Sequence, residues 1–548
     1  MPHNTLKEQF LKSILTGLQR KSITTCSHWA ELYRVMGGPS YPGPFRFTNH
    51  PWLRAMHDSA AEMNIGQKSA QMGFTETMLN ITFYNIDVRR IDCLYILPAK
   101  TPDAGDFSAA RFDAALELSP HLQNLFSDVK NVGHKRAGST NLYIRGSRSR
   151  AGLKSVPVGF IVLDEVDEMT QRNIPLALER TAGQLQKLAW LISTPTLEDE
   201  GISIHFKQSS QNHFYFKCPS CSRYIELSYP DSLVILGDDY DHPRIKESHL
   251  ICTLCKATLP HEDKSRWLAS SQWVESHTDR DIKGWYISQL YSPTIHPSAL
   301  AIAHFLARRD PTSEQEFYNS KLGLTHEVEG SRVTDASIKA ATGEYAMITS
   351  TTSSIVTMGV DVGHPYCHFE IDEWKLGNGD VSVTSRPRVI RIGTVVEFEE
   401  LDDLMRNFQI RFCVIDAHPE RRKAYEFALR FWGHVRLAFY VTGIAGKQIH
   451  ISDLAEPSIS VDRTAWLDLS LGRFKNNSIT IPYDAPSDYK HHIKTLVRIY
   501  DKDKDGNPIG RYANGSKADH FAHARNYAEI ALPLAVSQAS SQSISKVL

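Results

Sequence analysis

Three apolar runs, each ending in polar residues, constrain the fold of this chain most. They read IDCLYILPA, GFIVLDEV and KLAWLISTPT, and they alternate with helical patterns between about residues 51 and 196. Runs that are apolar throughout are typical of parallel strands buried on both faces, and chemistry collects where such strands end. The pattern predicts a parallel α/β sheet with a functional site at the carboxyl ends of its strands.

The 548 residues are too many for one hydrophobic core, so at least two domains are expected. A second α/β pattern begins at IVTMGVDVG, after a weakly patterned stretch, and the end of the chain is small and polar. We expect five parts: a helical region over 1–50, an α/β domain over 51–330, a linker over 331–354, a second α/β domain over 355–532 and a disordered tail over 533–548.

Composition indicates the cellular setting of the protein but gives little information about its partners. The net charge is −1, so any nucleic-acid surface must be local. No apolar run is long enough to cross a membrane, and the first residues lack the apolar core of a secretory signal. These features predict an intracellular, reducing setting without a membrane, in which the eight cysteines are thiols or metal ligands.

The stretch KSAQMGFT resembles the phosphate-binding loop G-x-x-x-x-G-K-[ST] with its lysine displaced. Phe74 takes the lysine position, and Lys68 takes that of the first glycine. Backbone N–H groups and the helix N-terminus supply most of a phosphate cradle, so a lysine at the other end of the loop can fold back over the phosphates. Thr75 remains to ligate Mg²⁺. The predicted nucleotide-binding residues of the loop are Lys68, Ser69, Ala70, Gln71, Met72, Gly73, Phe74 and Thr75.

An acidic strand end follows the loop in the chain. FIVLDEVDEM places Asp164 where a P-loop ATPase holds Mg²⁺ through water, and Glu165 where it polarises the attacking water. The alternative reading is a strand followed by an acidic helix start. The next buried run ends in STPT, where Thr194 is placed to sense the γ-phosphate. Loop, acidic strand and hydroxyl strand in this order predict an ATP site.

The segment 134–154 holds six Lys and Arg residues and no acidic residue. It is either a solvated basic loop, a DNA contact, or the source of an arginine that stabilises phosphoryl transfer in a neighbouring subunit. Arg148 and Arg150 are the candidates for that catalytic arginine.

Two C-x-x-C pairs lie in a cysteine-rich insert over about 212–258. Four thiolates at this spacing are typical of a structural zinc site with no ligand position left for water. The predicted ligands are Cys218, Cys221, Cys252 and Cys255, whereas Cys26, Cys93, Cys367 and Cys413 are scattered and expected to be core thiols.

Three aspartates in the second α/β block form another pattern. Asp361 and Asp416 end buried strands, and Asp519 opens a helix. Clustered carboxylates of this kind bind paired divalent ions in ribonuclease-H-like nucleases, with Mg²⁺ or Mn²⁺ as the suited metals. Three further residues either assist or are surface and packing residues: Glu397, His418 and His523.

As a set, these motifs resemble the large subunit of tailed-phage terminases, in the lambda-like branch. The resemblance covers about residues 25–530 in consistent order, and it includes GWYISQLYSP (284–293) and FYNSKLGLTHEV (317–328). It implies an α/β fold in which a P-loop (ASCE/RecA-like) ATPase domain with a zinc-ribbon insert precedes an RNase H-like (RuvC-type) nuclease domain. The DHFAHA helix departs from the commoner pattern of this branch.

The resemblance also implies a function. Members are ATP-driven motors that package double-stranded DNA into a capsid and cut the concatemer with a nuclease. The implied partners are DNA, a portal protein, a small terminase subunit and a homo-oligomeric ring, a pentamer by resemblance, in the host cytoplasm and transiently on the portal. The implied cofactors are ATP, Mg²⁺ or Mn²⁺, and Zn²⁺. Lys68 then takes the phosphate-lysine role, and Tyr41 or Phe45 contacts adenine.

Two other functions fit part of the pattern. A DEAD-like helicase or translocase has similar ATPase strands, but it needs a second RecA-like lobe with an arginine motif after residue 330, where acid-tipped strands occur instead. A zinc-ribbon DNA-binding or scaffold protein would show neither ATP hydrolysis nor metal-dependent cutting.

Overall fold

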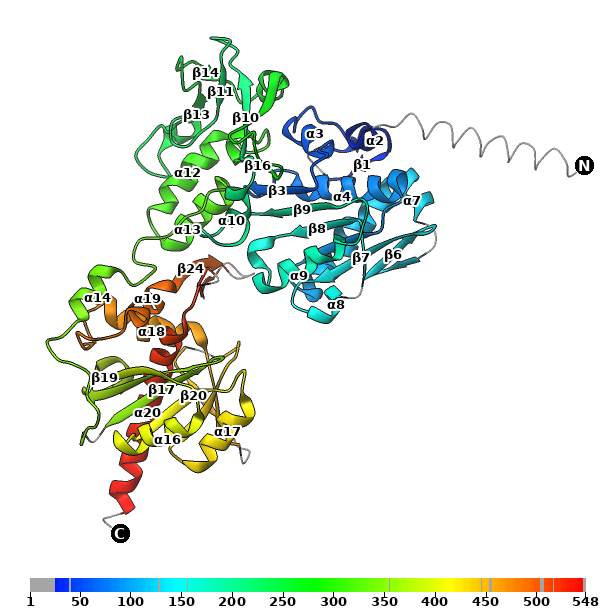
Figure 1. Cartoon of the computed structure of the whole chain (residues 1–548). Helices are drawn as coiled ribbons and strands as arrows, with labels where there is room; N and C mark the ends of the chain where they lie inside the picture. The colour runs from blue at the N-terminus through cyan, green and yellow to red at the C-terminus, as the bar shows by residue number, and fades with distance from the viewer. Residues whose placement is uncertain are drawn as a thin grey trace, which may run out of the picture. The chain divides into compact units, whose positions relative to one another are not determined.

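The computed structural model describes residues 25–545, apart from 39–40, 127–128, 155, 354, 445, 453–455, 503–506 and 516. The helical stretch expected from the apolar residues between 10 and 18 lies outside the described residues. The chain forms two compact units, Met1–His326 and Glu327–Leu548 (Figure 1).

The first unit is built on an 11-stranded sheet with strand order β11-β10-β16-β3-β9-β8-β4-β7-β6-β5, and β15 pairs with β10. The strands from β16 to β7 pair in parallel, and antiparallel strands complete both sides. The bounds are β3 (Met63–Lys68), β4 (Cys93–Leu97), β5 (Val129–Asn131), β6 (His134–Ala137), β7 (Thr140–Gly146), β8 (Phe160–Asp164), β9 (Leu188–Ser193), β10 (Asn212–Lys217), β11 (Tyr224–Glu226), β15 (Ser271–Glu275) and β16 (Lys283–Ile287).

The three apolar runs of the sequence are neighbouring parallel strands, as predicted. β4 and β8 are buried at every position, which explains why they carry no polar alternation. Their register brings strand ends to one edge of the sheet: Gln67 pairs with Ser193, and Asp164 pairs with Ile192. Residues far apart in sequence therefore meet at the carboxyl edge.

Helices cover this sheet. The 11-residue helix α4 (Phe74–Tyr84) follows the loop after β3, and nine of its residues are buried because it packs between the sheet and the N-terminal helices. The other α-helices are α2 (Cys26–Tyr33), α3 (Trp52–His57), α5 (Gly105–Phe107), α6 (Ala114–Leu118), α7 (Pro120–Leu125), α8 (Arg150–Lys154), α9 (Ile174–Leu178), α10 (Gly201–Gln208), α11 (Lys264–Trp267), α12 (Pro297–Ala307) and α13 (Pro311–Glu316).

The cysteine insert is continuous with the sheet rather than a separate ribbon. Its first strands, β10 and β11, belong to the large sheet, and β12 (Leu233–Val234), β13 (His249–Ile251) and β14 (Thr258–Leu259) form a small sheet beside them. Phe216, Cys218 and Cys252 lie in the same hydrophobic cluster as the centre of the unit. The insert therefore shares a core with the sheet that carries the site.

The second unit has a seven-stranded sheet with strand order β19-β18-β17-β20-β21-β23-β22. β17, β18 and β19 are an antiparallel meander, whereas β20, β21 and β23 continue in parallel from β17. The bounds are β17 (Val356–Val362), β18 (Cys367–Lys375), β19 (Arg386–Val395), β20 (Phe412–Asp416), β21 (Val435–Tyr440), β22 (Ile449–Ile451) and β23 (Ser458–Val461).

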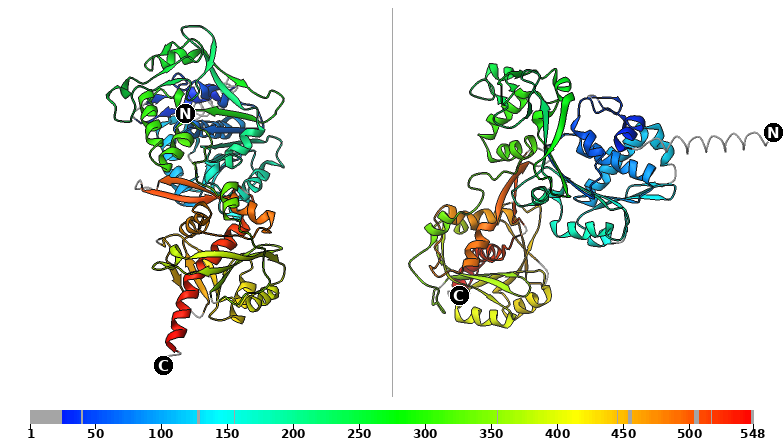
Figure 2. Two further views of the ribbon diagram at one scale, coloured as in Figure 1. Left: turned by 90° about the vertical axis from the view of Figure 1, so that its left-hand side faces the viewer. Right: turned by 45° about the horizontal axis from the view of Figure 1, so that its top comes forward.

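Helices cover both faces of this second sheet (Figure 2). α16 (Phe398–Asn407) and α17 (Arg421–Arg430) pack on the side of Met358 and Val360. The other face receives α18 (Arg463–Lys475) and α20 (His520–Ser545), and α20 crosses β17, β18 and β20. The remaining elements are α14 (Asp335–Ala341), α15 (Val381–Thr384), α19 (Ser487–Thr495) and a hairpin of β24 (Val497–Lys502) and β25 (Pro508–Ala513).

Two expectations about the ends of this unit are wrong. The 331–354 stretch is not a free linker, because Val333, Ile338 and Ala341 are buried in the core of the second unit. The tail expected to be disordered from residue 533 continues α20 as far as Ser545. Small residues such as Ala and Ser, which suggested disorder, are compatible with a helix that packs closely on a sheet.

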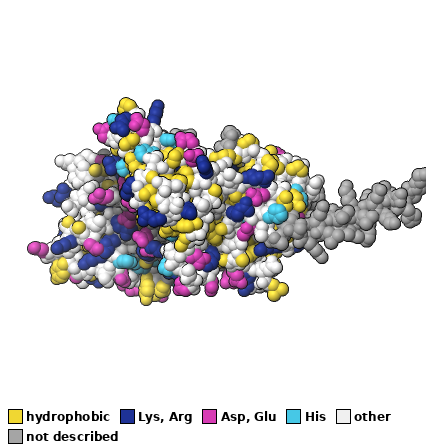
Figure 3. Space-filling view, turned by 90° about the horizontal axis from the view of Figure 1, so that it is seen from above, with side chains coloured by type: hydrophobic (Ala, Val, Ile, Leu, Met, Phe, Trp, Pro, Cys, Tyr) yellow, Lys and Arg dark blue, Asp and Glu magenta, His cyan; other side chains and the backbone are white. Residues whose placement is uncertain are grey.

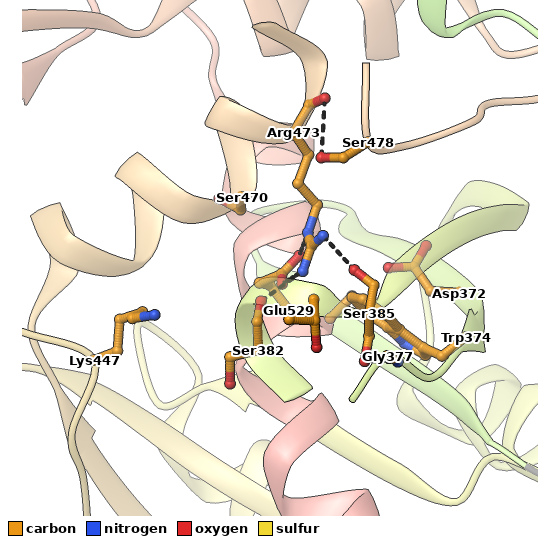
Figure 4. A network of polar contacts seen from close by, with 12 residues as sticks. Asp372, Trp374, Gly377, Ser382, Ser385, Lys447, Ser470, Arg473, Ser478 and Glu529 are labelled. Carbon is orange, nitrogen blue, oxygen red and sulfur yellow. Dashed lines mark hydrogen bonds and ion pairs between the residues drawn. The ribbon is translucent and has the colours of Figure 1, made fainter. Parts of the chain in front are cut away.

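A buried network of charges fixes α18 and α20 to the second sheet (Figure 4). Arg473 donates from Nε to Glu529 Oε2 at 2.7 Å and from Nη1 to the carbonyl of Ser385 at 2.7 Å. Arg525, one helical turn before Glu529, pairs with Glu370, Asp372 and Glu529. Because all these charges are buried, each acid depends on an arginine partner.

Basic and acidic side chains are interspersed on the face drawn in Figure 3, in keeping with the balanced composition. Among the described helices, none is both long and apolar enough to cross a membrane.

Candidate functional site

The candidate phosphate loop joins β3 to α4 in the first unit. Gln71 (φ 61°) and Gly73 (φ 83°) adopt left-handed backbone and turn the chain into the helix. The backbone N–H groups of 71–75 make no hydrogen bond to the described loops and strands around them. They lie at the N-terminus of an 11-residue helix, an arrangement suited to an anion. Phe74, in the usual lysine position, is buried against Gly66 and cannot be replaced by a charged residue without loss of core packing.

Neighbouring segments hold the start of the loop. Ser69 donates its N–H to the carbonyl of Ile287 at 3.0 Å, and Ala70 donates to Ser320 at 2.8 Å. Gln289 Nε2 donates to the carbonyl of Ala70 at 3.0 Å. These acceptors and donors lie in GWYISQLYSP and FYNSKLGLTHEV, so the two motifs support the loop.

Asn319, in η10 (Phe317–Lys321), links the segment that contacts the phosphate loop to the residues that follow β9. Its Nδ2 donates to the carbonyl of Thr196 at 3.0 Å and to that of Leu324 at 2.7 Å. Gly323 (φ 68°) approaches the loop so closely that a Cβ there would lie 2.7 Å from the nitrogen of Ser69. The STPT segment and the phosphate loop are therefore held by one turn.

Lys68 lies at the end of β3 and points toward the acidic strand end. Its Nζ donates to Glu165 Oε1 at 2.9 Å and to Thr194 Oγ1 at 3.5 Å. Burial lowers the pKa of Lys68, but the charges of Glu165 and Asp164 outweigh burial and raise it overall. Glu165 has left-handed backbone (φ 64°), an uncommon conformation for a non-glycine residue and one found at functional turns. The displaced lysine thus lies beside the residue predicted as general base.

Asp164 is buried at the end of β8. Its Oδ2 accepts hydrogen bonds from Tyr95 Oη at 2.6 Å and Thr75 Oγ1 at 3.2 Å. Its Oδ1 is buried without a hydrogen-bond partner among the described residues. Burial and the charge of Glu165 raise the pKa of Asp164 to about 6. A free carboxylate oxygen beside a threonine hydroxyl fits the ligand set of a hydrated Mg²⁺ ion.

A cavity of about 500 Å³ opens next to the loop. Gln71, Gly73 and Glu76 line its loop side. Tyr41 and Phe45 line the other side, where Tyr41 is 40% exposed and Phe45 is buried. The volume and aromatic lining suit a purine base attached to phosphates in the loop.

The four cysteines of the insert converge as predicted. Cys218 Sγ lies 3.9 Å from Cys255 Sγ, and Cys221 Sγ lies 3.9 Å from Cys252 Sγ. Two thiolates bound to one tetrahedral ion at about 2.3 Å lie about 3.8 Å apart. The donor set therefore fits zinc, and the four other cysteines are buried thiols.

The second unit presents an acidic site at the face covered by α20. Asp361 on β17 is paired across the strands with His368 on β18. His520 Nδ1, at the first residue of α20, lies 2.9 Å from Asp361 Oδ2. One ligand atom from each of Asp361, His368 and His520 lies within 4.8 Å of the others.

The other two predicted aspartates have their own partners. Asp416 ends β20, and its Oδ1 accepts the N–H of His418 at 3.0 Å. Burial, with the nearby charge of Asp361, raises the pKa of Asp416 to about 6. Burial raises the pKa of Asp519, but hydrogen bonding and charge from His523 lower it overall. Asp416 and Asp519 do not join the three-residue group around Asp361, which is compatible with ligands divided between two ions.

Comparisons with known proteins agree on one family. Residues 40–273 match the family model of the ATPase domain of phage terminase large subunit gpA. Residues 282–446 match the model of the endonuclease domain of the same subunit. The chain belongs to the phage terminase large subunits. Its activities are ATP hydrolysis that drives DNA packaging and endonucleolytic cutting of DNA.

One solved structure is similar at the level of the fold, and a second aligns with a lower TM-score. The HK97 bacteriophage large terminase is 10% identical, with a TM-score of 0.50 over 92% of this chain and 98% of that chain. The Thermus phage P74-26 large terminase ATPase domain is 12% identical, with a TM-score of 0.32 over 52% of this chain and 94% of that chain. No curated protein matches the sequence. The helicase alternative is not supported, since the second match is to a terminase endonuclease domain.

Other residues singled out from the terminase sequence have varied positions. Arg148 and Arg150 are exposed just after β7, whose carboxyl end lies at the same edge of the sheet as the phosphate loop. Glu397 is the N-terminal cap of α16 and forms a capping box with Glu400, which is a structural role. His523 contacts Asp519 at 3.4 Å.

Sequence reasoning missed several residues of the two terminase sites. Tyr95 gave no signal, because its hydroxyl reaches Asp164 only through the pairing of β4 with β8. His368 had a readable signal: His368, Glu370 and Asp372 alternate with apolar residues, which predicts a polar strand face. The contact of that face with α20 is decided by the tertiary fold.

Proposed function

We propose that the first unit is the P-loop (ASCE/RecA-like) ATPase domain of the terminase and the second its RNase H-like (RuvC-type) nuclease domain. Two features support the ATPase assignment. β9 lies between β3, which leads into the phosphate loop, and β8, which ends in Asp164. The phosphate loop and the acidic residues also lie at the same edge of the sheet. The second sheet supports the nuclease assignment, with three antiparallel strands followed by parallel ones. The boundary falls between His326 and Glu327.

The roles in ATP hydrolysis follow from the contacts. The backbone N–H groups of 71–75 cradle the phosphates, and Lys68 moves from Glu165 to the β/γ-phosphates when they enter. Thr75 and Asp164, whose side chains are hydrogen-bonded to each other, would hold Mg²⁺, which would supply charge neutralisation at the phosphates. Glu165, released from the lysine, accepts a proton from the attacking water. Thr194 senses the γ-phosphate, since its hydroxyl already lies beside Lys68.

The cavity beside the loop takes the base of ATP, with Tyr41 and Phe45 as its aromatic walls. Arg148 or Arg150 reaches a neighbouring subunit's ATP, because both are exposed at the edge where the phosphates bind. That role requires the homo-oligomeric ring, for which a pentamer is the family's arrangement. The portal protein, the small terminase subunit and double-stranded DNA are the proposed partners, in the host cytoplasm.

In the nuclease, Asp361, Asp416 and Asp519 would hold divalent ions, which would supply water activation and stabilisation of the leaving oxygen. Burial, together with the charge of Asp361, raises the pKa of Asp416, and this supports the assignment because a nearby cation would offset both effects. The cysteine cluster holds a structural Zn²⁺ in a ribbon that braces the ATPase sheet.

The observation that carries the proposal is the 2.9 Å contact of the displaced Lys68 with Glu165. Lys68→Ala and Asp361→Ala in the full chain test it as a pair. We expect Lys68→Ala to abolish ATP hydrolysis and retain metal-dependent plasmid cleavage, and Asp361→Ala to do the reverse. ATP turnover in Lys68→Ala would reject the loop assignment, and loss of both activities in either folded variant would reject separate sites.

A further inference from the structure

A carboxylate and two imidazoles converge beneath the start of α20. Asp361, His368 and His520 come from β17, β18 and α20, and one ligand atom of each lies within 4.8 Å of the others. Two imidazoles and one carboxylate differ from the all-oxygen ligand set that the three aspartates would provide.

The backbone fixes these three side chains next to one another. Asp361 and His368 are directly opposite in the antiparallel pair, so their side chains share a face of the sheet. Gly359, two residues earlier on that face, lets α20 touch the sheet: a Cβ there would lie 2.0 Å from the carbonyl oxygen of Ala524. This close approach brings His520 down onto Asp361.

The distances are those of ligands around one ion. His520 Nδ1 and Asp361 Oδ2 are 2.9 Å apart, and two ligands at about 2.1 Å from an ion and at right angles are separated by about 3 Å. The His368 ring stacks on that of His520 with centroids 4.6 Å apart. His368 Nδ1 is buried and has no hydrogen-bond partner among the described residues. An unpartnered ring nitrogen at this place is a free ligand atom.

We propose that Asp361, His368 and His520 bind one divalent transition-metal ion, through one carboxylate and two imidazole nitrogens. The inference rests on the proposed nuclease function, since this ion is then one of the pair that cuts DNA. Imidazole ligands favour ions such as Fe²⁺, Ni²⁺ or Zn²⁺ over Mg²⁺, which prefers oxygen. Asp416 and Asp519 are left to the second ion.

Mn²⁺ is the probe, because a directly bound imidazole couples its ¹⁴N nucleus to the electron spin of the ion. Pulsed electron paramagnetic resonance is measured on the full chain with Mn²⁺ and without nucleotide. We expect ¹⁴N coupling in the wild type and its loss in a His368→Ala/His520→Ala variant, with Mn²⁺ affinity at least tenfold weaker. His491→Ala is the control, since His491 is an exposed histidine of α19, and it should keep the coupling.

The outcomes separate the inference from the proposed function. Mn²⁺ binding without ¹⁴N coupling, no Mn²⁺ binding, or coupling that persists in the double variant would each overturn the inference. Plasmid cleavage by Asp361→Asn, measured beside these spectra, tests the nuclease assignment itself. Cleavage lost in Asp361→Asn with no ¹⁴N coupling in the wild type would leave the nuclease proposal standing and remove only the imidazole ligands. Circular dichroism and ATP hydrolysis of each variant establish that it is folded.

Discussion

Lys68 Nζ lies 2.9 Å from Glu165 Oε1, across the gap between the end of β3 and the end of β8. A lysine displaced to the far end of its loop still reaches the acidic strand end, because β3 and β8 are separated by only one strand. The side chain proposed to bind phosphate and the side chain proposed to activate water therefore neutralise each other in the absence of nucleotide.

Glu165→Gln should separate ATP binding from ATP hydrolysis. The amide cannot accept the proton of the attacking water, so we expect hydrolysis to fall by about 10²–10⁴-fold. Binding of a fluorescent ATP analogue should be retained, because Lys68 is no longer held by a charged partner. Glu198→Gln, an exposed glutamate, is the control and should leave both measurements unchanged. Turnover at the wild-type rate would contradict the general-base role.

Asn319→Ala should weaken the connection between the STPT segment and the phosphate loop. It removes three hydrogen bonds: two that Nδ2 donates to the carbonyls of Thr196 and Leu324, and one that Oδ1 accepts from Gln315 Nε2. Each partner loses one hydrogen bond that the alanine side chain cannot replace. The cost is about 1–3 kcal/mol of stability. We expect a lower unfolding temperature and less DNA packaged per ATP hydrolysed. Ser320→Ala is the matched control, since only the backbone carbonyl of Ser320 contacts the loop.

Cys252→Ser should release the ion of the cysteine cluster. The expected result is loss of about one equivalent of zinc, measured with a chromogenic chelator, and a lower unfolding temperature of the ATPase unit. The effect should extend beyond the insert because Cys252 and Phe216 belong to the unit's main hydrophobic cluster. Cys413→Ser, at a buried thiol of the other unit, should leave the zinc content unchanged.

The nuclease unit should require residues before 350 for stability. Val333 and Ile338 are buried in its core, and a buried side chain of this size contributes roughly 1.5–3 kcal/mol. A fragment of residues 327–548 should therefore unfold at a higher urea concentration than a fragment of residues 350–548. Equal midpoints would show that α14 adds nothing to the fold.

Glu529→Gln should destabilise the same unit strongly. Glu529 is buried and is the acidic partner of the buried Arg473 (Figure 4). Neutralising Glu529 leaves Arg473 without a counterion. Arg525, by contrast, keeps its pairs with Glu370 and Asp372. Breaking such a pair costs about 3–5 kcal/mol. Urea unfolding should reveal this loss, whereas Glu344→Gln, at an exposed position, should unfold like the wild type. A change below about 1 kcal/mol would indicate that the network is dispensable.

Local sequence patterns were sufficient for the strands that carry chemistry. Fully apolar runs predicted β4 and β8, because a strand buried on both faces needs apolar residues at every position. The polar residues that follow these runs indicated the edge of the sheet that carries the site. The C-x-x-C pairs predicted a four-thiolate cluster for a similar reason, since few other sites need that spacing. The predictions of a linker over 331–354 and of a disordered tail over 533–548 were wrong. Weak hydrophobic patterning does not distinguish a disordered segment from a helix that packs through small residues.

By itself the sequence determined the order of strands and loops, the residue types at each strand end, and hence the terminase family. Only the tertiary structure decided which of those residues meet. Tyr95 reaches Asp164 through strand pairing, and His368 reaches His520 because Gly359 admits α20 to the sheet. The physical reason is that the pattern of residue types along the chain reflects burial and local geometry. Contacts between distant segments depend instead on strand register and on how closely two backbones can approach.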